Sequence, residues 1–117
     1  QNIKVNMTLC FWLNQAILAA SAGATYVSPF IGRLEDAGGD GIGLIANIRS
    51  VYNNYSIKTE ILAASIRTLE HVEQVALNGA NAVTLPIKIL SEMINHQLTE
   101  VGLKKFNDDW MNSGKKI

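Results

Sequence analysis

Two arginines and a serine stand at positions that suit an anion site. Arg33, Ser65 and Arg67 each lie at or just beyond the end of a short apolar segment. A guanidinium group binds phosphate through two parallel hydrogen bonds, and a hydroxyl supplies a further donor. The three residues therefore predict phosphate binding. The alternative is that both arginines form local salt bridges, for example Arg33 with Glu35 or Asp36.

Other polar residues alternate with apolar ones inside these segments. Asn6 and Thr8 would share one face of an extended strand, with Val5, Met7 and Leu9 on the other. Ser28 and Phe30 would likewise share a face of the next segment. Polar side chains at the carboxyl ends of parallel strands are typical of active sites in α/β folds. The alternative for Asn6 and Thr8 is that they satisfy backbone groups of a loop.

The elements that must position these residues alternate between strands and helices. We expect strands at Val5–Phe11, Thr25–Phe30, Lys58–Ser65 and Ala82–Leu85. We expect a glycine-rich loop over Gly32–Gly41, and helices at Asn14–Ala22, Ile42–Tyr55, Leu69–Asn78 (capped by Thr68), Ile87–Asn95 and Thr99–Asn112. This alternation predicts an α/β fold of parallel strands with right-handed crossovers. Four such units make either a small doubly wound sheet or half of a barrel, and the polar strand faces favour the barrel.

Composition and charge exclude several classes of function. The 117 residues carry ten basic and ten acidic side chains, so nucleic acid and anionic membranes are not expected partners. No apolar run approaches the roughly 20 residues of a membrane-spanning helix. The single cysteine, Cys10, excludes an internal disulfide and suits a reducing cytoplasm. His71 and His96 lack metal-ligand spacing, so we expect both at the surface and no metal site.

Several strings in the chain resemble the transaldolase family, particularly its short bacterial and archaeal members. They are Val5–Phe11 with Asn14–Ala16, Gly23–Arg33, Ile61–Arg67, Leu98–Leu103 and Phe106–Trp110. The resemblance covers essentially the whole chain in order. It implies the C-terminal half of a (β/α)8 TIM barrel, namely strands five to eight plus a C-terminal helix. Residues 1–97 would form four βα units, and residues 98–117 the last helix and tail.

The resemblance also implies a chemistry and residue roles. Transaldolases transfer a dihydroxyacetone unit between sugar phosphates through a lysine Schiff base, with acid–base assistance and no cofactor. By position, Asn6 and Thr8 would line the catalytic centre, with Thr8 helping to hold a water molecule. Ser28 and Phe30 would shape the dihydroxyacetone end, and Arg33, Ser65 and Arg67 would bind the sugar phosphate. That assignment strengthens the phosphate prediction.

Three departures from the family pattern bear on function. The related fructose-6-phosphate aldolases carry tyrosine at the position of Phe30 and tend to carry alanine at that of Ser28, so both residues favour transaldolase activity. Trp12 and Leu13 replace a small pair typical of the family. Trp12 would either crowd the mouth of the site or pack under a loop.

The reactive lysine of the family has no counterpart here, because its Lys-Ile-Pro type motif is missing. The catalytic aspartate and glutamate of strands one and three are also missing. Glu35, Asp36 and Asp40 fall in the expected loop and should be solvated. We therefore expect the isolated chain to be inactive.

Half a barrel leaves strand edges and an inner face uncovered, which favours association. We expect pairing with the missing N-terminal half or with a second copy, as in a homo-oligomer. Leu103, Phe106 and Trp110 line one side of the last helix, which would contact a neighbour as in the ring-forming short members, or pack on its own barrel. Because the chain starts at Gln1, we expect an enzyme fragment; the alternatives are a non-catalytic half-barrel that binds sugar phosphate or self-associates, and another sugar-phosphate barrel lyase.

Overall fold

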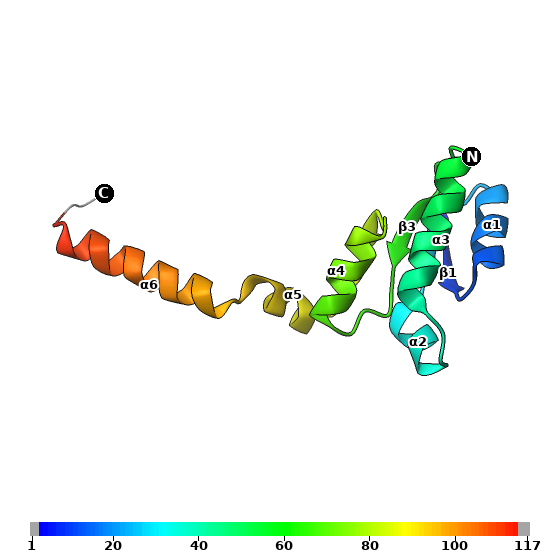
Figure 1. Cartoon of the computed structure of the whole chain (residues 1–117). Coiled ribbons are helices and arrows are strands. Elements are labelled where there is room, and N and C mark those ends of the chain that lie inside the picture. Colours follow the sequence, from blue (N-terminus) through cyan, green and yellow to red (C-terminus); the bar gives the residue numbers. More distant parts are fainter. Residues whose placement is uncertain (1–2, 115–117) are drawn as a thin grey trace. The chain divides into compact units, whose positions relative to one another are not determined.

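The computed structural model describes residues 3–114 and divides the chain into two compact units. The first unit, Gln1–Pro86, holds a four-stranded sheet with helices α1 to α4 (Figure 1). The second unit, Ile87–Ile117, holds helices α5 and α6. The site residues predicted from the sequence all belong to the first unit.

The strands are β1 (Asn6–Cys10), β2 (Tyr26–Pro29), β3 (Glu60–Ala63) and β4 (Ala82–Val83). They are all parallel and lie in the order β1-β2-β3-β4. The predicted parallel α/β fold is therefore confirmed. Sequential order means that the carboxyl ends of β1, β2 and β3 lie side by side at one edge of the sheet, which brings the loops after these strands together.

The helices are α1 (Leu13–Ser21), α2 (Ile31–Asp36), α3 (Gly41–Asn54), α4 (Leu69–Leu77), α5 (Ile87–Ile94) and α6 (Gln97–Asn112). Asp40 caps α3 by accepting the Gly43 N–H, and Thr68 caps α4 as predicted by accepting the His71 N–H. Every predicted helix is present, with boundaries shifted by at most two residues.

The prediction of a continuous loop over Gly32–Gly41 is wrong, because α2 occupies its first half. Ile31, which is fully buried, anchors this short helix, and its N–H donates to the Ala64 carbonyl. The Gly32 N–H donates to the Ser65 carbonyl in the same way. Because α2 has only 6 residues, it shows no apolar periodicity, and tertiary bonds to the end of β3 stabilise it.

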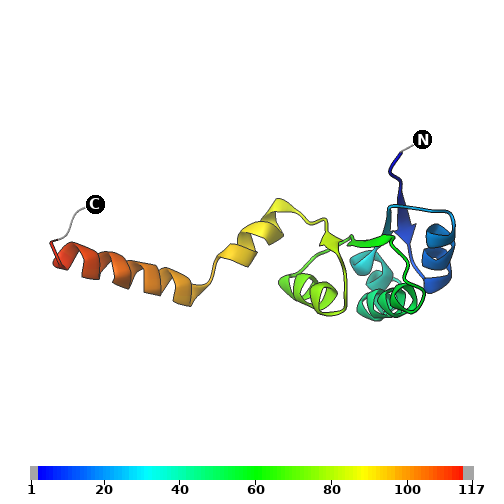
Figure 2. The same cartoon turned by 90° about the horizontal axis from the view of Figure 1, so that it is seen from above.

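The helices α1, α3 and α4 lie on one side of the sheet (Figure 2). Right-handed crossovers between strands in sequential order place every connecting helix on the same face. A doubly wound sheet has helices on both faces, so that alternative is not what the chain forms. The arrangement is consistent with part of a TIM barrel, whose helices form an outer ring around a parallel sheet.

The core lies between the sheet and these helices. Val27 and Ile61 from the strands pack with α3, of which Ile45, Ile48 and Tyr52 are fully buried. The Tyr52 hydroxyl donates to the Ala16 carbonyl of α1 at 2.7 Å. This packing holds α1 and α3 against the strands whose ends carry the site residues.

The second unit is described by itself. No residue of α6 is buried, and Leu103, Phe106 and Trp110 are 57%, 70% and 40% exposed. Within the second unit, these three side chains are not covered. Residues 115–117 of the predicted tail lie outside the described residues. Within residues 3–114, no helix is both long and apolar enough to cross a membrane.

Candidate active site

Asn6 and Ser28 meet at the candidate site. The Ser28 hydroxyl donates to Asn6 Oδ1 at 2.9 Å, from β2 to β1. Ser28 is only 2% exposed, whereas Asn6 is exposed. The bond leaves the Asn6 side-chain NH2 group directed elsewhere. The Asn6 side-chain bond in the structure is to another side chain and not to a loop backbone, which was the alternative considered from the sequence.

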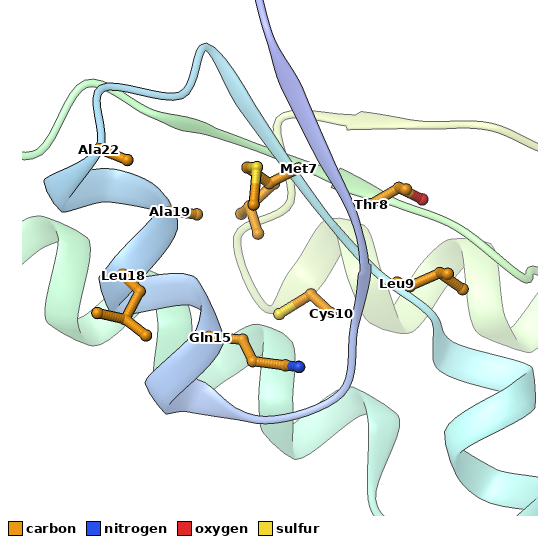
Figure 3. A pocket seen from close by; sticks show the side chains of 9 residues that line it. Met7, Thr8, Leu9, Cys10, Gln15, Leu18, Ala19 and Ala22 are labelled. Carbon is orange, nitrogen blue, oxygen red and sulfur yellow. The ribbon is translucent and has the colours of Figure 1, made fainter.

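The end of β1 carries a β-bulge that alters the predicted pattern of faces. The pairing with β2 shifts register between Met7 and Cys10, and Leu9 has φ 54° in the left-handed region. Figure 3 shows Met7 and Cys10 on the α1 side of the strand and Thr8 and Leu9 on the other. The prediction that Leu9 shares a face with Met7 is therefore wrong. Bulges recur beside active sites because they re-aim side chains.

A hollow of about 430 Å³ lies between β1 and α1 (Figure 3). It is lined by Met7, Thr8, Leu9, Cys10, Gln15, Leu18, Ala19, Ala22 and Val27. Burial raises the pKa of the Cys10 thiol, which disfavours the nucleophilic thiolate. The hollow is mainly apolar and, of the predicted site residues, contains only Thr8. It is an uncovered strand edge and not the candidate active site.

Phe30 stands between Arg33 and Phe11. The Arg33 guanidinium carbon lies 5.4 Å from the centre of the Phe30 ring, within cation–π range. The Phe11 ring packs against Phe30 at 6.0 Å between centroids. Among the described residues, Arg33 makes no ion pair, so a local salt bridge with Glu35 or Asp36 is wrong. The edges of the guanidinium stay available for an anion.

Ser65 lies in the left-handed region, with φ 58°, just after β3. Its hydroxyl oxygen accepts the Arg33 N–H at 3.0 Å, and its carbonyl accepts the Gly32 N–H at 2.8 Å. A Cβ atom at Gly32 would lie 2.6 Å from both the Ser65 carbonyl oxygen and Arg67 Nε. The start of α2, Ser65 and the Arg67 side chain therefore meet at Gly32.

Arg67 is paired with Asp36, its NH1 atom lying 2.6 Å from Asp36 Oδ1. The hydrogen bond from Arg67 lowers the pKa of Asp36, and the same bond raises the pKa of Arg67. Asp36 is exposed, as predicted, but it belongs to α2 and not to a loop, and its carboxylate orients Arg67. Asp40 is also engaged, as the cap of α3. One guanidinium nitrogen of Arg67 binds Asp36, and its other N–H groups can bind an anion.

His71 joins the same cluster, which the sequence reasoning missed. Its Nδ1 accepts the Arg67 backbone N–H at 3.1 Å, and its Nε2 lies 2.8 Å from Glu35 Oε1. Its side chain is only 12% exposed, so the prediction of a surface histidine is wrong for His71. His96 is exposed, as predicted, and accepts the Leu98 N–H at the start of α6. Only the spacing from Thr68 to His71, which suits a helix cap, hinted at this contact.

The two lysines of the first unit, Lys4 and Lys58, lie away from the strand ends that carry the site. Lys4 and Lys58 precede β1 and β3, at the opposite edge of the sheet. The second unit carries Lys88, Lys104 and Lys105, while Lys115 and Lys116 fall outside the described residues.

Trp12 is the N-cap residue of α1 and is 64% exposed, so it does not pack under a loop.

Residues 1–117 match the family described as Transaldolase/Fructose-6-phosphate aldolase. The chain belongs to this family. Its parallel four-stranded sheet is consistent with part of the TIM barrel of this family. The resemblance inferred from the sequence is therefore confirmed.

Curated relatives in this family are named probable transaldolases. The chain is 56% identical over 117 residues to the one from Bartonella henselae, covering 100% of this chain and 54% of that protein. It is 55% identical to the one from Maricaulis maris, with the same coverage, and 58% identical over 114 residues to the one from Brucella ovis, covering 97% of this chain and 52% of that protein. The chain thus spans about half the length of these relatives.

Solved structures of other proteins share the fold at low sequence identity. A mandelate oxidase variant with 2-hydroxy-phenylacetamide has a TM-score of 0.58 and 23% identity over 73% of this chain and 25% of that one. A flavocytochrome b2 variant with sulfite bound has a TM-score of 0.61 and 17% identity over 73% of this chain and 23% of that one. At this level of identity the likeness concerns the fold alone.

Proposed function

We propose that this chain is the C-terminal half of a TIM-barrel transaldolase, contributing strands five to eight and the trailing helix. The complete barrel would transfer a dihydroxyacetone unit between sugar phosphates through a lysine Schiff base. Family membership and the names of the relatives support the activity. The chain matches about half of each relative, and the lysines of its first unit, Lys4 and Lys58, precede β1 and β3, so we assign the Schiff-base lysine to the other half.

The observation that carries this proposal is the meeting of the Arg33 backbone, Ser65 and the Arg67 side chain around Gly32. Ser65 Oγ accepts a bond from the Arg33 backbone, which leaves its hydroxyl hydrogen free to donate. Arg67 Nε comes within 2.6 Å of where a Cβ at Gly32 would stand. The guanidinium of Arg33 on α2, with the hydroxyl of Ser65 and the guanidinium of Arg67 on the loop after β3, suits a phosphate dianion. We assign the sugar phosphate to this place.

Asn6 and Thr8 would act at the reacting carbons. Asn6 is oriented by Ser28 and retains an NH2 group that can donate to a substrate oxygen. Thr8 points to the side of β1 away from α1, where it would hold the water molecule that relays protons (Figure 3). Ser28 and Phe30 would shape the dihydroxyacetone end. No group in this account needs a cofactor.

Transaldolase activity is favoured over fructose-6-phosphate aldolase activity by Phe30. Its ring has no hydroxyl, and Arg33 and Phe11 pack against it. The position therefore offers no acid for a free aldol reaction. A phenol at the same position would add one, which distinguishes the two activities within the family.

The chain alone should be inactive and should associate. Met7 and Leu9 on the edge strand β1 are each 45% exposed, and the sheet face opposite the helices has no helix on it in this unit. Exposed edges and apolar faces recruit partners. We propose that the missing N-terminal half is the physiological partner, with a second copy as the alternative, and that the complete barrels form a homo-oligomer. Cys10, a buried free thiol, suits a cytoplasmic location.

The test is reconstitution. This chain is mixed with the part of the Bartonella henselae relative that it does not cover, and transfer from fructose 6-phosphate to an aldose phosphate is measured. Activity is expected in the mixture only, and Arg67→Met in the chain should raise KM for the sugar phosphates. Activity of the chain alone contradicts the proposal, as does a mixture that co-elutes without any transfer activity.

A further inference from the structure

His71 lies where two elements of the phosphate cluster approach each other. It is the third residue of α4, and its own N–H is bound by the cap residue Thr68 at 3.0 Å. Its ring then reaches back to the Arg67 backbone N–H and across to Glu35, which is 36 positions earlier in the chain. The imidazole thus links the loop after β3 to the last turn of α2.

The two contacts fix the tautomer of the ring. Nδ1 faces the N–H of Arg67, so it must offer a lone pair. Nε2 faces a carboxylate oxygen of Glu35, so it must carry the proton. The neutral ring with its proton on Nε2 satisfies both partners at once. A ring with its proton on Nδ1 would place two donors against each other at the Arg67 backbone.

The charged groups around His71 belong to the candidate site. Glu35 and its neighbour Asp36 form the end of α2, and Asp36 binds the Arg67 guanidinium. Arg67 is thereby held at its backbone by His71 and at its guanidinium by Asp36. Asp36 lies on α2, and His71 contacts Glu35 of α2, so both contacts connect Arg67 to the helix that also carries Arg33.

We propose that His71 is a positioning residue for sugar-phosphate binding, holding the Arg67 backbone to the Glu35 end of α2. The proposal rests on the phosphate site assigned under the proposed function. His71 does not touch the substrate in this account. Its effect reaches the ligand only through Arg67, so its loss should weaken phosphate binding without changing the chemical step.

A competing explanation is that His71 only caps α4. Accepting a backbone N–H near the first turn stabilises a helix, whatever the helix then binds. In that case replacing His71 lowers the melting temperature and leaves ligand affinity unchanged. The contact with Glu35 argues against a purely local role, because a cap does not require a partner from α2.

Two conservative variants separate the contacts of the ring. In His71→Asn the side-chain oxygen falls near the position of Nδ1 and can still accept the Arg67 N–H. In His71→Gln the amide nitrogen falls near Nε2 and keeps the link to Glu35, but the Arg67 N–H loses its acceptor. His96→Gln, a change at the exposed histidine of the second unit, is the matched control.

The experiment titrates the full chain and each variant with fructose 6-phosphate, following the backbone amides of Arg33, Ser65 and Arg67 by NMR. The imidazole nitrogens of the wild-type chain are read in the same samples. We expect the Nε2–H tautomer at His71, an affinity within about twofold of wild type for His71→Asn and His96→Gln, and about fivefold weaker binding for His71→Gln, as one lost hydrogen bond predicts.

The possible failures are distinct. If the wild-type chain shows no response at those three amides, the phosphate site itself is wrong and the role of His71 fails with it. If the wild-type chain binds and both His71 variants bind equally well, or both bind equally poorly, the positioning role is overturned while the phosphate site stands. An Nδ1–H tautomer in the wild-type chain also overturns it.

Discussion

The Ser28 hydroxyl donates to Asn6 Oδ1 at 2.9 Å, across neighbouring strands β2 and β1. Ser28 is buried, and Asn6 is exposed on the strand that ends in the bulge. The donor fixes which way the Asn6 amide points. Its NH2 group is thereby presented outward, which is the orientation that the proposed chemistry needs.

Ser28→Ala should lower the transfer rate of the reconstituted barrel by about fivefold, since one buried hydrogen bond is worth about 1 kcal/mol. Ser50→Ala, on the exposed side of α3, is the matched control. An unchanged rate for Ser28→Ala would contradict the proposed role of Ser28 in orienting the Asn6 amide.

Arg67→Met should raise the pKa of the Asp36 carboxyl towards that of an ordinary aspartate. The cause is loss of the hydrogen bond that holds this pKa down. Arg33→Met should raise it less, because Arg33 acts on Asp36 only through its charge. Carbon-13 NMR of the side-chain carboxyl against pH measures both shifts. Equal shifts would contradict the pairing seen here.

The Asp36–Arg67 pair makes the stability of the fold depend on pH. Because the folded-state pKa of Asp36 lies below the unfolded value of about 3.9, its contribution is present above that pH. The contribution is lost as the pH falls through the folded-state value. Acid unfolding of Arg67→Met should therefore lack this component, and both partners are exposed enough that the difference is small.

Tyr52→Phe should destabilise the first unit by about 1–3 kcal/mol, because the Ala16 carbonyl loses a buried donor. Burial raises the pKa of Tyr52 to about 12. Its stabilisation is therefore full below the unfolded pKa of about 10 and declines as the pH rises towards 12. Urea unfolding at neutral and alkaline pH measures both effects. Tyr55→Phe, at a side chain that is 75% exposed, should be neutral.

Gly32→Ala should disrupt the link between α2 and the end of β3. The new Cβ would lie 2.6 Å from the Ser65 carbonyl oxygen, which is backbone and cannot yield cheaply. We expect a loss of about 1–3 kcal/mol in the free energy of unfolding and a marked loss of sugar-phosphate affinity. Gly102→Ala, in open space on α6, should be neutral or slightly stabilising. Unchanged affinity in Gly32→Ala would contradict the proposed phosphate site.

The sequence predicted the elements whose patterns are local. Strand and helix alternation fixed the parallel fold, and Thr68 was recognisable as a cap because capping depends on a few adjacent residues. Period-two alternation placed Asn6 with Thr8 on one strand face and Ser28 with Phe30 on another, but the contact between Ser28 and Asn6 needs the pairing of β1 with β2.

Features that depend on distant partners were missed. The short helix α2 forms because its first N–H groups bind the Ala64 and Ser65 carbonyls, a contact that no local pattern encodes. The pairing of Glu35 with His71 spans 36 positions. The bulge at Leu9 arises from pairing with β2, and ordinary alternation cannot anticipate it.

The central claim is that this chain binds the sugar phosphate while the other half of the barrel supplies the Schiff-base lysine. The most direct measurement is borohydride trapping with fructose 6-phosphate, read by intact mass, on the chain alone and on the chain mixed with the remaining part of the Bartonella henselae relative. The account predicts an adduct only in the mixture, carried by the added part. An adduct on this chain would contradict it, because one of its own lysines would then form the Schiff base.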